Sequence, residues 1–533
     1  MNLSKSAKNL IFRYQAWFQS LQPREDIIKI HVDEVASKVA SFYEKVREII
    51  DWREEHLLRK TAVKRVLKRR MFRKKEGEAI AEPLIHELIR AGHFPNDSIP
   101  ESKITEIQKI IDKYIFIINN APSPPKEKKG LQFYDWLSGI AACEVEEALA
   151  PPIRENALME YMFEMMKERI EVREGILIKG GMQESEKDTQ IYIAVQRALF
   201  KLDEPIISYH LLAKWYPEWA DLNPEKLQEI TQNIYSLWEK IEKALKHSLS
   251  EKFYKVCEKY DTPYLILGDV ISADPAAAQE NLENPEVLEN KVKEAYGGRL
   301  KKVKARMRRA AIYSTISIFI TKVLLSFAVE VPFDKYVTHQ YSDLTLGLNI
   351  LIPPALMFVL ILTIKPPSKQ NAELVVMEVT KIVYERERTD VYEIRPTPKR
   401  GLVLNLIVQG AYLVSFAASF GLIVWGLRQL NFSVLSIIIF LMFVSLISFA
   451  GMKIRQRAKE LVVEKERESF FFTFVDAFSL PFLRVGRWLS AQWTKYNTLV
   501  VLFDSFLDMP FQVFVQFLEH WRSFIKEKKE EIH

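Results

Sequence analysis

The sequence predicts an all-α fold: a multi-helical cytosolic N-terminal domain, then a four-helix transmembrane domain, then C-terminal amphipathic helices at the membrane surface. Residues 1–298 are charged throughout, whereas residues 310–455 contain long stretches with almost no charge. Such a split is typical of a soluble domain joined to a membrane domain. Only 17 of the 533 residues are glycine, which suits helices joined by short connections.

The cytosolic domain is expected over residues 1–271. Apolar residues recur at helical spacing in 104–120, 155–172 and 224–249, and segments rich in breakers separate these stretches. The only segment with the pattern of a strand is 389–396, which lies in a later loop. The domain is therefore expected to be almost entirely helical.

Residues 272–309 are expected to form a linker and a basic juxtamembrane helix that continues into the first span. The transmembrane domain is predicted over residues 310–455. A membrane-crossing helix needs about 20 mostly apolar residues, because the hydrocarbon layer is roughly 30 Å thick. Four segments meet this requirement: 310–331, 344–364, 403–427 and 433–452.

The distribution of basic residues predicts how these spans are oriented. The segments 299–309, 365–402 and 453–467 carry seven, eight and six Lys and Arg residues, respectively. The two opposite loops, 332–343 and 428–432, carry one each. Since basic residues accumulate on the cytosolic side, both termini are expected in the cytosol. No signal-peptide pattern is visible at the N-terminus, so we expect a multi-pass protein of the plasma (inner) membrane.

Residues 456–533 are expected to form an amphipathic interfacial tail. In 470–490 the uncharged runs are too short to span a bilayer, and polar residues that include Asp476 fall near one helical face. In 497–520, Asp504 and Asp508 belong to a narrow polar stripe on an otherwise apolar helix. We predict that both helices lie in the inner leaflet. Packing against the cytosolic domain, or a fifth and sixth span, are the alternatives.

Two clusters of basic residues are candidates for contact with anionic lipid headgroups. Segment 59–75 has ten basic residues in seventeen, and segment 299–309 directly precedes the first span. For the first cluster the alternatives are pairing with acidic neighbours and binding of nucleic acid. Nucleic acid is not favoured, because aromatic residues are not interleaved and the net charge is only +6. The candidates for lipid contact are Lys64, Arg65, Lys68, Arg69, Arg70, Arg73, Lys301, Lys302, Lys304, Arg308 and Arg309.

Lys322 is the clearest functional candidate within the spans. It lies twelve residues after Ala310, about 18 Å along a helix. An ionisable group at such depth is costly unless it is paired or reaches water. Its side chain is expected to snorkel outward, to form a structural ion pair or to serve translocation. Glu330 is the nearest acidic residue in the sequence.

Other polar or helix-disrupting residues in the spans are weaker candidates. Pro353 and Pro354 lie midway through the second span and are expected to kink or break it. Broken helices line binding sites in several transporters. Asn349 and Gln409 are expected to form hydrogen bonds between helices.

The sequence lacks the common motifs of enzyme active sites. We find no phosphate-binding, dinucleotide-binding, zinc-protease or nucleophile-elbow pattern. The two cysteines, Cys143 and Cys257, are too few for a disulfide framework or a zinc cluster. We therefore predict no catalytic residue, no cofactor and no metal site. Missing motifs do not favour an enzyme, although they do not exclude one.

Two functions are compatible with this organisation. The first is a membrane-anchored scaffold or adaptor that holds a cytosolic partner at the inner leaflet. The second is an oligomeric transporter or channel, with a polar path through Lys322 and a helix break at Pro353 and Pro354. The expected partners are anionic membrane lipids and a cytosolic protein, and a homo-oligomer is a further option. Architecture alone does not decide between the two functions.

Overall fold

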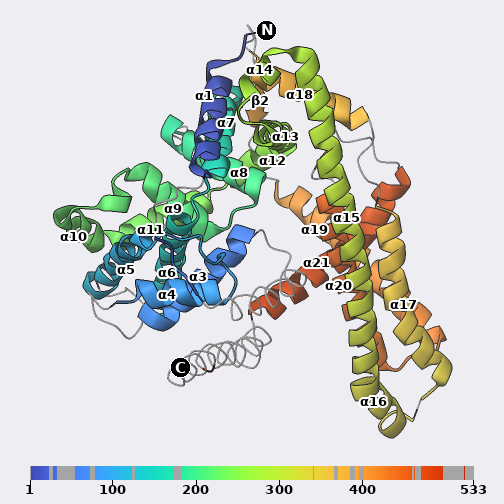
Figure 1. Cartoon of the computed structure of the whole chain (residues 1–533). Coiled ribbons are helices and arrows are strands. Elements are labelled where there is room, and N and C mark those ends of the chain that lie inside the picture. Colours follow the sequence, from blue (N-terminus) through green and yellow to red (C-terminus); the bar gives the residue numbers. More distant parts are fainter. Residues whose placement is uncertain are drawn as a thin grey trace, which may run out of the picture. The chain divides into compact units, whose positions relative to one another are not determined.

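The computed structural model shows a predominantly helical chain that forms two compact units (Figure 1). The N-terminal unit covers Lys5–Asp261 and also includes residues 390–394. The membrane unit covers 262–384 and 401–495. The structure describes residues 2–22, 28–32, 55–71, 79–122, 127–172, 182–339, 341–364, 370–384, 390–394, 401–458, 461–462, 470–495 and 521.

The described part of the N-terminal unit contains helices and one short pair of strands. β1 (Ile170–Val172) pairs in parallel with β2 (Tyr392–Ile394). β2 confirms the extended segment predicted at 389–396. The helix expected over 155–172 ends at Arg169 instead, because β1 begins at the next residue. The helices of this unit are α1 (Lys5–Ser20), α3 (Glu55–Met71), α4 (Ala81–Arg90), α5 (Ser102–Asn120), α6 (Glu127–Leu149), α7 (Ile153–Arg169), α8 (Glu184–Phe200), α9 (Glu204–Trp215), η1 (Trp219–Asp221), α10 (Pro224–Gln232), α11 (Ile234–Leu245) and α12 (Ser250–Lys259).

A buried polar network joins three elements of the N-terminal unit. Lys113 on α5 donates hydrogen bonds to the Glu144 carboxylate on α6 and to the Trp219 carbonyl of η1. Tyr114 Oη and Trp219 Nε1 donate to Glu144 Oε2 over 2.6 and 3.0 Å. Burial lowers the pKa of Lys113, and the Glu144 carboxylate opposes that shift. Because the ion pair is hydrogen-bonded on both sides, it fixes the packing of these elements instead of leaving a charge uncompensated.

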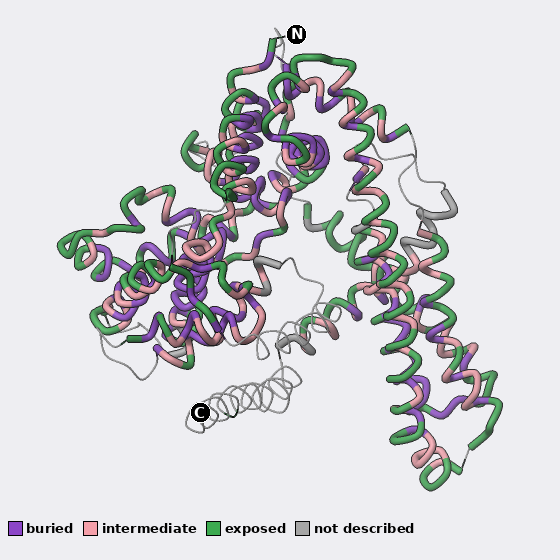
Figure 2. The backbone as a smooth tube through the Cα atoms, viewed as in Figure 1, coloured by how far each residue is buried: buried purple, intermediate pink, exposed green. Residues whose placement is uncertain are grey.

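Four helical segments of the membrane unit are long and apolar enough to cross a membrane. They are Pro285–Tyr336, Asp343–Leu362, Val403–Gln429 and Val434–Gln456. They coincide with the four apolar segments expected from the sequence and suggest a membrane protein. Figure 2 shows exposed residues along these segments, many of them large and apolar, as expected of surfaces that face lipid. The elements of this unit are α13 (Asp261–Ala273), α14 (Ala278–Glu283), α15 (Pro285–Leu325), the π-helical segment η2 (Ser326–Glu330), α16 (Val331–Tyr336), α17 (Asp343–Leu362), α18 (Gln370–Val383), α19 (Leu402–Gln429), α20 (Val434–Ala458) and α21 (Phe470–Lys495).

The first span begins in the second half of the long helix α15 and continues into η2. The side chain of Asn284 caps its start by accepting hydrogen bonds from the backbone N–H groups two and three residues later, and Pro285 suits the first position. The helix has 41 residues, about 60 Å at 1.5 Å per residue. That is twice the hydrocarbon thickness, so its basic first half extends beyond the span. Arg299 forms an ion pair with Asp269, which fixes this half against α13.

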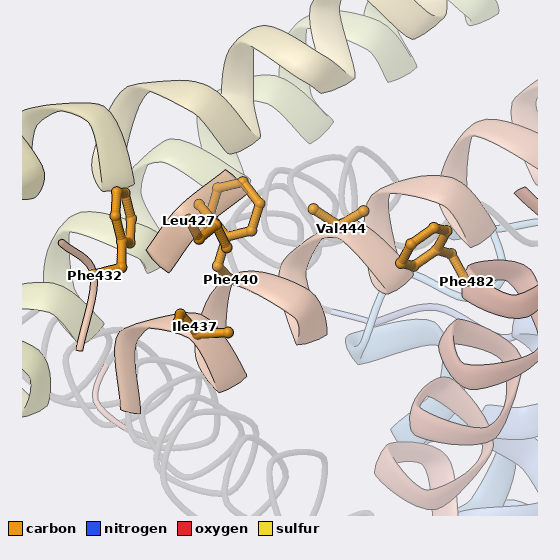
Figure 3. Close-up of a cluster of buried hydrophobic side chains, with 6 residues drawn as sticks. All are labelled: Leu427, Phe432, Ile437, Phe440, Val444 and Phe482. Atoms are coloured by element: carbon orange, nitrogen blue, oxygen red, sulfur yellow. The ribbon is translucent and has the colours of Figure 1, made fainter. Parts of the chain in front are cut away.

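Packing among the spans and α21 produces two apolar clusters. One contains Leu427, Phe432, Ile437, Phe440, Val444 and Phe482, drawn in Figure 3. The other contains Met357, Ile439, Phe443, Ile447 and Ile454. Gly451 allows close approach of α20 to α17, because an added Cβ would collide with the Leu360 side chain.

The expected break at Pro353 and Pro354 is not found. α17 is one continuous helix through both prolines. The two residues lie on its buried face, in the row that also contains Asn349 and Met357. Membrane helices tolerate internal prolines more readily than soluble helices do.

α21 packs on the middle of α19 and α20 and runs obliquely to α15 (Figure 1). Ser419 Oγ of α19 donates a hydrogen bond of 3.0 Å to the Phe478 carbonyl of α21. Phe482 is buried against Phe420, with ring centroids 4.5 Å apart. At Gly486 the two backbones nearly touch, because an added Cβ would collide with the Ser445 carbonyl.

Candidate functional site

Four polar side chains meet in the interior of the membrane unit, and we call them the intramembrane cluster: Lys322, Ser326, Glu330 and Asn349. Lys322 and Glu330 are 0% and 1% exposed. Lys322 Nζ donates to Glu330 Oε1 over 2.6 Å. Ser326 Oγ and Asn349 Nδ2 donate to the other carboxylate oxygen over 2.9 and 2.6 Å. One carboxylate thus accepts hydrogen bonds from a cation, a hydroxyl and an amide.

The π-helical segment brings Lys322 and Glu330 onto one face. In a regular helix a separation of eight residues turns the second side chain by about 80° from the first. A π turn contains one extra residue, so Glu330 takes the place that the seventh residue would have, within about 20° of Lys322. The N–H of Val331 donates to the carbonyl of Ser326, five residues earlier, which is the hydrogen bond of this wider turn. Helical periodicity in the sequence predicts neither the π turn nor the shared face of Lys322 and Glu330.

α17 contributes Asn349, two of whose oxygen atoms lack a usual donor. Asn349 Oδ1 is buried and has no hydrogen-bond partner among the residues that the structure describes. The backbone carbonyl of Asn349 lacks its usual helical donor, because residue 353 is proline and has no N–H. The cluster thus combines an amide side chain on α17 with a cation on α15.

α20 closes the cluster from a third side. Lys322 Nζ lies 5.4 Å from the centre of the Phe443 ring, so the ammonium group also faces aromatic π-electrons. Toward the start of α20, Ser436 Oγ donates to Asp334 Oδ2 over 3.3 Å. The charges of Lys322 and Glu330 cancel inside a water-poor environment, where an unpaired charge would cost several kcal/mol.

The structure unites three of the residues singled out in the spans and separates the others. Lys322, Glu330 and Asn349 are in direct contact, and snorkelling of Lys322 is wrong because its side chain is enclosed. Pro353 and Pro354 continue the buried face of α17 beyond Asn349. Gln409 is exposed on α19.

The acidic residues of the tail fall outside what the structure describes. This holds for Asp504 and Asp508 and for the side chain of Asp476. Arg73 of the first basic cluster also lies outside the described residues.

The basic residues of α3 mostly form ion pairs within the N-terminal unit. Lys64 and Lys68 pair with Asp135, and Arg69 and Arg70 pair with Glu87. Arg65 is half-buried on the same helix. The opposite side of α3 is buried core. The positive charge of this cluster is thus largely balanced by acidic residues of the same unit, which agrees with the alternative of pairing with acidic neighbours.

The basic residues of α15 have a different environment. Lys301, Lys302, Lys304, Arg308 and Arg309 are all exposed, on the stretch directly before the span. Their position and exposure suit contact with anionic headgroups.

Sequence reasoning missed two residues that folding brings to the intramembrane cluster and two buried polar groups of the N-terminal unit. Ser326 and Phe443 gave no signal, because a serine and a phenylalanine are ordinary in a membrane helix. In the N-terminal unit, His210 is buried with its two ring nitrogens 2.6 Å from Gln196 Oε1 and Glu147 Oε1. Glu146 is also buried there, beside Arg59, and burial raises the pKa of its carboxyl to about 7.

Comparison with known proteins gives no further guide to the site. No protein-family model matches the chain, and no curated protein or solved structure shows significant similarity to it.

Proposed function

We propose that the protein is a membrane-anchored scaffold, in which the helical bundle fixes the chain in the bilayer and the N-terminal unit holds a cytosolic partner at the inner leaflet. The observation that carries this proposal is the closure of the intramembrane cluster. Lys322 and Glu330 neutralise each other without contact with solvent, and Ser326 and Asn349 satisfy the remaining carboxylate oxygen. A bundle of this kind is stable as an anchor without any ligand.

The N-terminal unit suits the role of a rigid partner-binding body. It has its own apolar core, and its network around Glu144 is hydrogen-bonded on both sides. The cations of α3 are engaged in its own ion pairs, so the proposal assigns lipid contact to the exposed basic residues of α15. In this proposal both termini lie in the cytosol and the lipid partner is the anionic inner leaflet.

A second candidate is a transporter of a small cation or proton, in this chain alone or in an oligomer. Two observations favour it: the π-helical segment that carries Glu330, and the buried Asn349 Oδ1, which has no hydrogen-bond partner among the described residues. π turns are frequent at functional sites. In such a transporter Lys322 would act as the internal cation of Glu330, to be displaced when a cation or proton arrives.

The two functions are separated by a variant that removes both charges together. Lys322→Met combined with Glu330→Gln leaves no buried charge without its partner, so the bundle is expected to fold. If the protein is a scaffold, the double variant captures the same cytosolic protein as wild type from its own membranes, at low and moderate salt. If it is a transporter, reconstituted vesicles lose cation or proton flux in the double variant.

The control is Lys335→Met, which removes an exposed cation at the outer end of α16. It should leave both partner capture and flux unchanged. Recovery of wild-type protein alone, without a stoichiometric partner, together with flux that depends on the Lys322–Glu330 pair, would overturn the scaffold in favour of the transporter.

A further inference from the structure

An exposed stripe along α21 consists of five residues at helical spacing, which we call the α21 stripe: Leu480, Arg484, Arg487, Trp488 and Ala491. The opposite side of the helix is buried at Phe482 and Gly486 against α19 and α20. The helix is therefore fixed in the bundle by one face and presents two arginines and a tryptophan on the other.

The depth of α21 follows from its contact with α20. Gly486 packs against Ser445 and Phe449, which precede the exposed Lys453 by eight and four residues. At 1.5 Å per residue, the crossing point lies about 6–12 Å inside the polar end of α20. That depth lies within the acyl-chain layer of one leaflet. The long side chain of an arginine can snorkel from such a position toward the phosphates.

Arg484 is held in a geometry that leaves its hydrogen-bond donors free. Its guanidinium carbon lies 3.9 Å from the centre of the Tyr412 ring on α19. Stacking occupies the face of the guanidinium and leaves the N–H groups along its edge for a planar acceptor such as phosphate. Among the residues that the structure describes, no carboxylate forms an ion pair with Arg484 or Arg487.

We propose that the α21 stripe is a binding site for an anionic phospholipid. The two guanidinium groups bind the phosphate and headgroup, while Leu480 and Trp488 contact the acyl chains below. The site adds a specific lipid contact to the general attraction of the α15 lysines and arginines. It rests on the inner-leaflet location in the proposed function, but not on the scaffold role.

Trp488 supplies a local probe of the site. Full-length protein is placed in phosphatidylcholine vesicles that contain increasing phosphatidylglycerol, with bromine on the acyl chains of one lipid at a time. Bromine quenches tryptophan in contact, and subtraction of the Trp488→Phe variant isolates the signal of Trp488. The ratio of the two quenching curves gives the preference for phosphatidylglycerol over phosphatidylcholine at this position.

Wild type is expected to prefer phosphatidylglycerol at Trp488, and Arg484→Gln with Arg487→Gln should reduce the preference about thirtyfold. This value takes about 1 kcal/mol for each cation near the headgroups and 1.4 kcal/mol for each factor of ten. The control variant Lys5→Gln with Lys8→Gln removes two exposed cations from α1 and should keep the wild-type preference. Both arginines are exposed, so their replacement does not disturb the core.

Three outcomes would overturn the site, and they differ in what they say of the proposed function. If wild type and the arginine variant prefer phosphatidylglycerol equally, anionic lipid remains a partner but the α21 stripe is not its binding site. Absence of any preference in wild type also removes the anionic lipid partner from the proposed function. Displacement of the lipid by soluble glycerol phosphate would mean that the arginines bind free phosphate instead of a lipid.

Discussion

Lys322 is enclosed in the membrane unit, so the energetic cost of its positive charge depends on neighbouring side chains. Glu330 provides the counter-charge, and Phe443 provides a weaker electrostatic contact from α20. Such a pair gains little over two well-packed apolar residues, because both ions have left water. Loss of one partner is costly, however, because the other charge remains buried. The two residues should therefore behave as a unit.

We predict that Lys322→Met alone destabilises the protein by about 3–5 kcal/mol, because it leaves the Glu330 carboxylate without a cation. Adding Glu330→Gln should restore most of the lost stability. The measurement is thermal and denaturant unfolding of the purified protein in detergent. Lys335→Met is the matched control and should change stability by less than about 0.5 kcal/mol, since Lys335 is exposed. Additive losses in the double variant would contradict the coupling.

Glu146 should make the stability of the N-terminal unit depend on pH. Burial raises the pKa of its carboxyl from 4.5 to about 7, with Arg59 acting in the opposite sense. The folded unit thus binds a proton that the unfolded chain has already released above pH 4.5. Stability from this group is therefore present below about pH 4.5 and is lost as pH rises toward 7.

We predict that Glu146→Gln removes this dependence. Between the pKa of the unfolded chain and that of the folded unit, wild type should lose about 3 kcal/mol from this group, at about 1.4 kcal/mol for each pH unit. The Tm of the full-length protein in detergent, followed from pH 5 to 8, should fall less in the variant than in wild type. Parallel Tm curves for the two proteins would show that Glu146 does not titrate in this range.

At the scale of elements, two glycines in the membrane unit have opposite surroundings. Gly486 lies where α21 crosses α20, and an added Cβ would meet the Ser445 carbonyl and lie 2.8 Å from Phe449 Cβ. Gly421 on α19 has no atom within 4 Å of an added Cβ. Backbone atoms cannot move aside as flexible side chains do, so only Gly486 is required for packing.

We predict that Gly486→Ala weakens the packing of α21, whereas Gly421→Ala leaves it unchanged or slightly improves helix stability. The loss for Gly486→Ala should be about 1–3 kcal/mol, the usual cost of overpacking. Limited proteolysis in native membranes should release α21 faster in this variant, and its Tm should fall. Equal behaviour of the two variants would contradict the close crossing of α21 and α20.

At the scale of the whole molecule, the arrangement of basic residues predicts opposite exposure of the two ends of the first span. The native Cys143 and Cys257 are both buried, so they should react little with a thiol reagent. In intact cells an impermeant thiol reagent should label Thr338→Cys but not Lys301→Cys. After permeabilisation both should react. Labelling of Lys301→Cys from outside would reverse the predicted orientation.

The sequence by itself predicted the helical class and the four long apolar helices, because both follow from local properties. The length of an apolar run sets whether a helix crosses a bilayer, and helical spacing reveals the remaining helices. The strand near Tyr392 was also predicted, whereas its partner at Ile170 was not. A three-residue strand has too little pattern of its own to be distinguished from the end of a helix.

Tertiary structure alone decided how the candidate residues are used. The π turn at Ser326–Glu330 changes the face on which Glu330 lies, and Asn349 reaches the carboxylate from another helix. The acids that neutralise α3 come from positions distant in the sequence, such as Asp135. α17 also stays continuous through its two prolines. These outcomes depend on tertiary contacts, and the hydrophobic pattern of a single sequence does not show which residues form them.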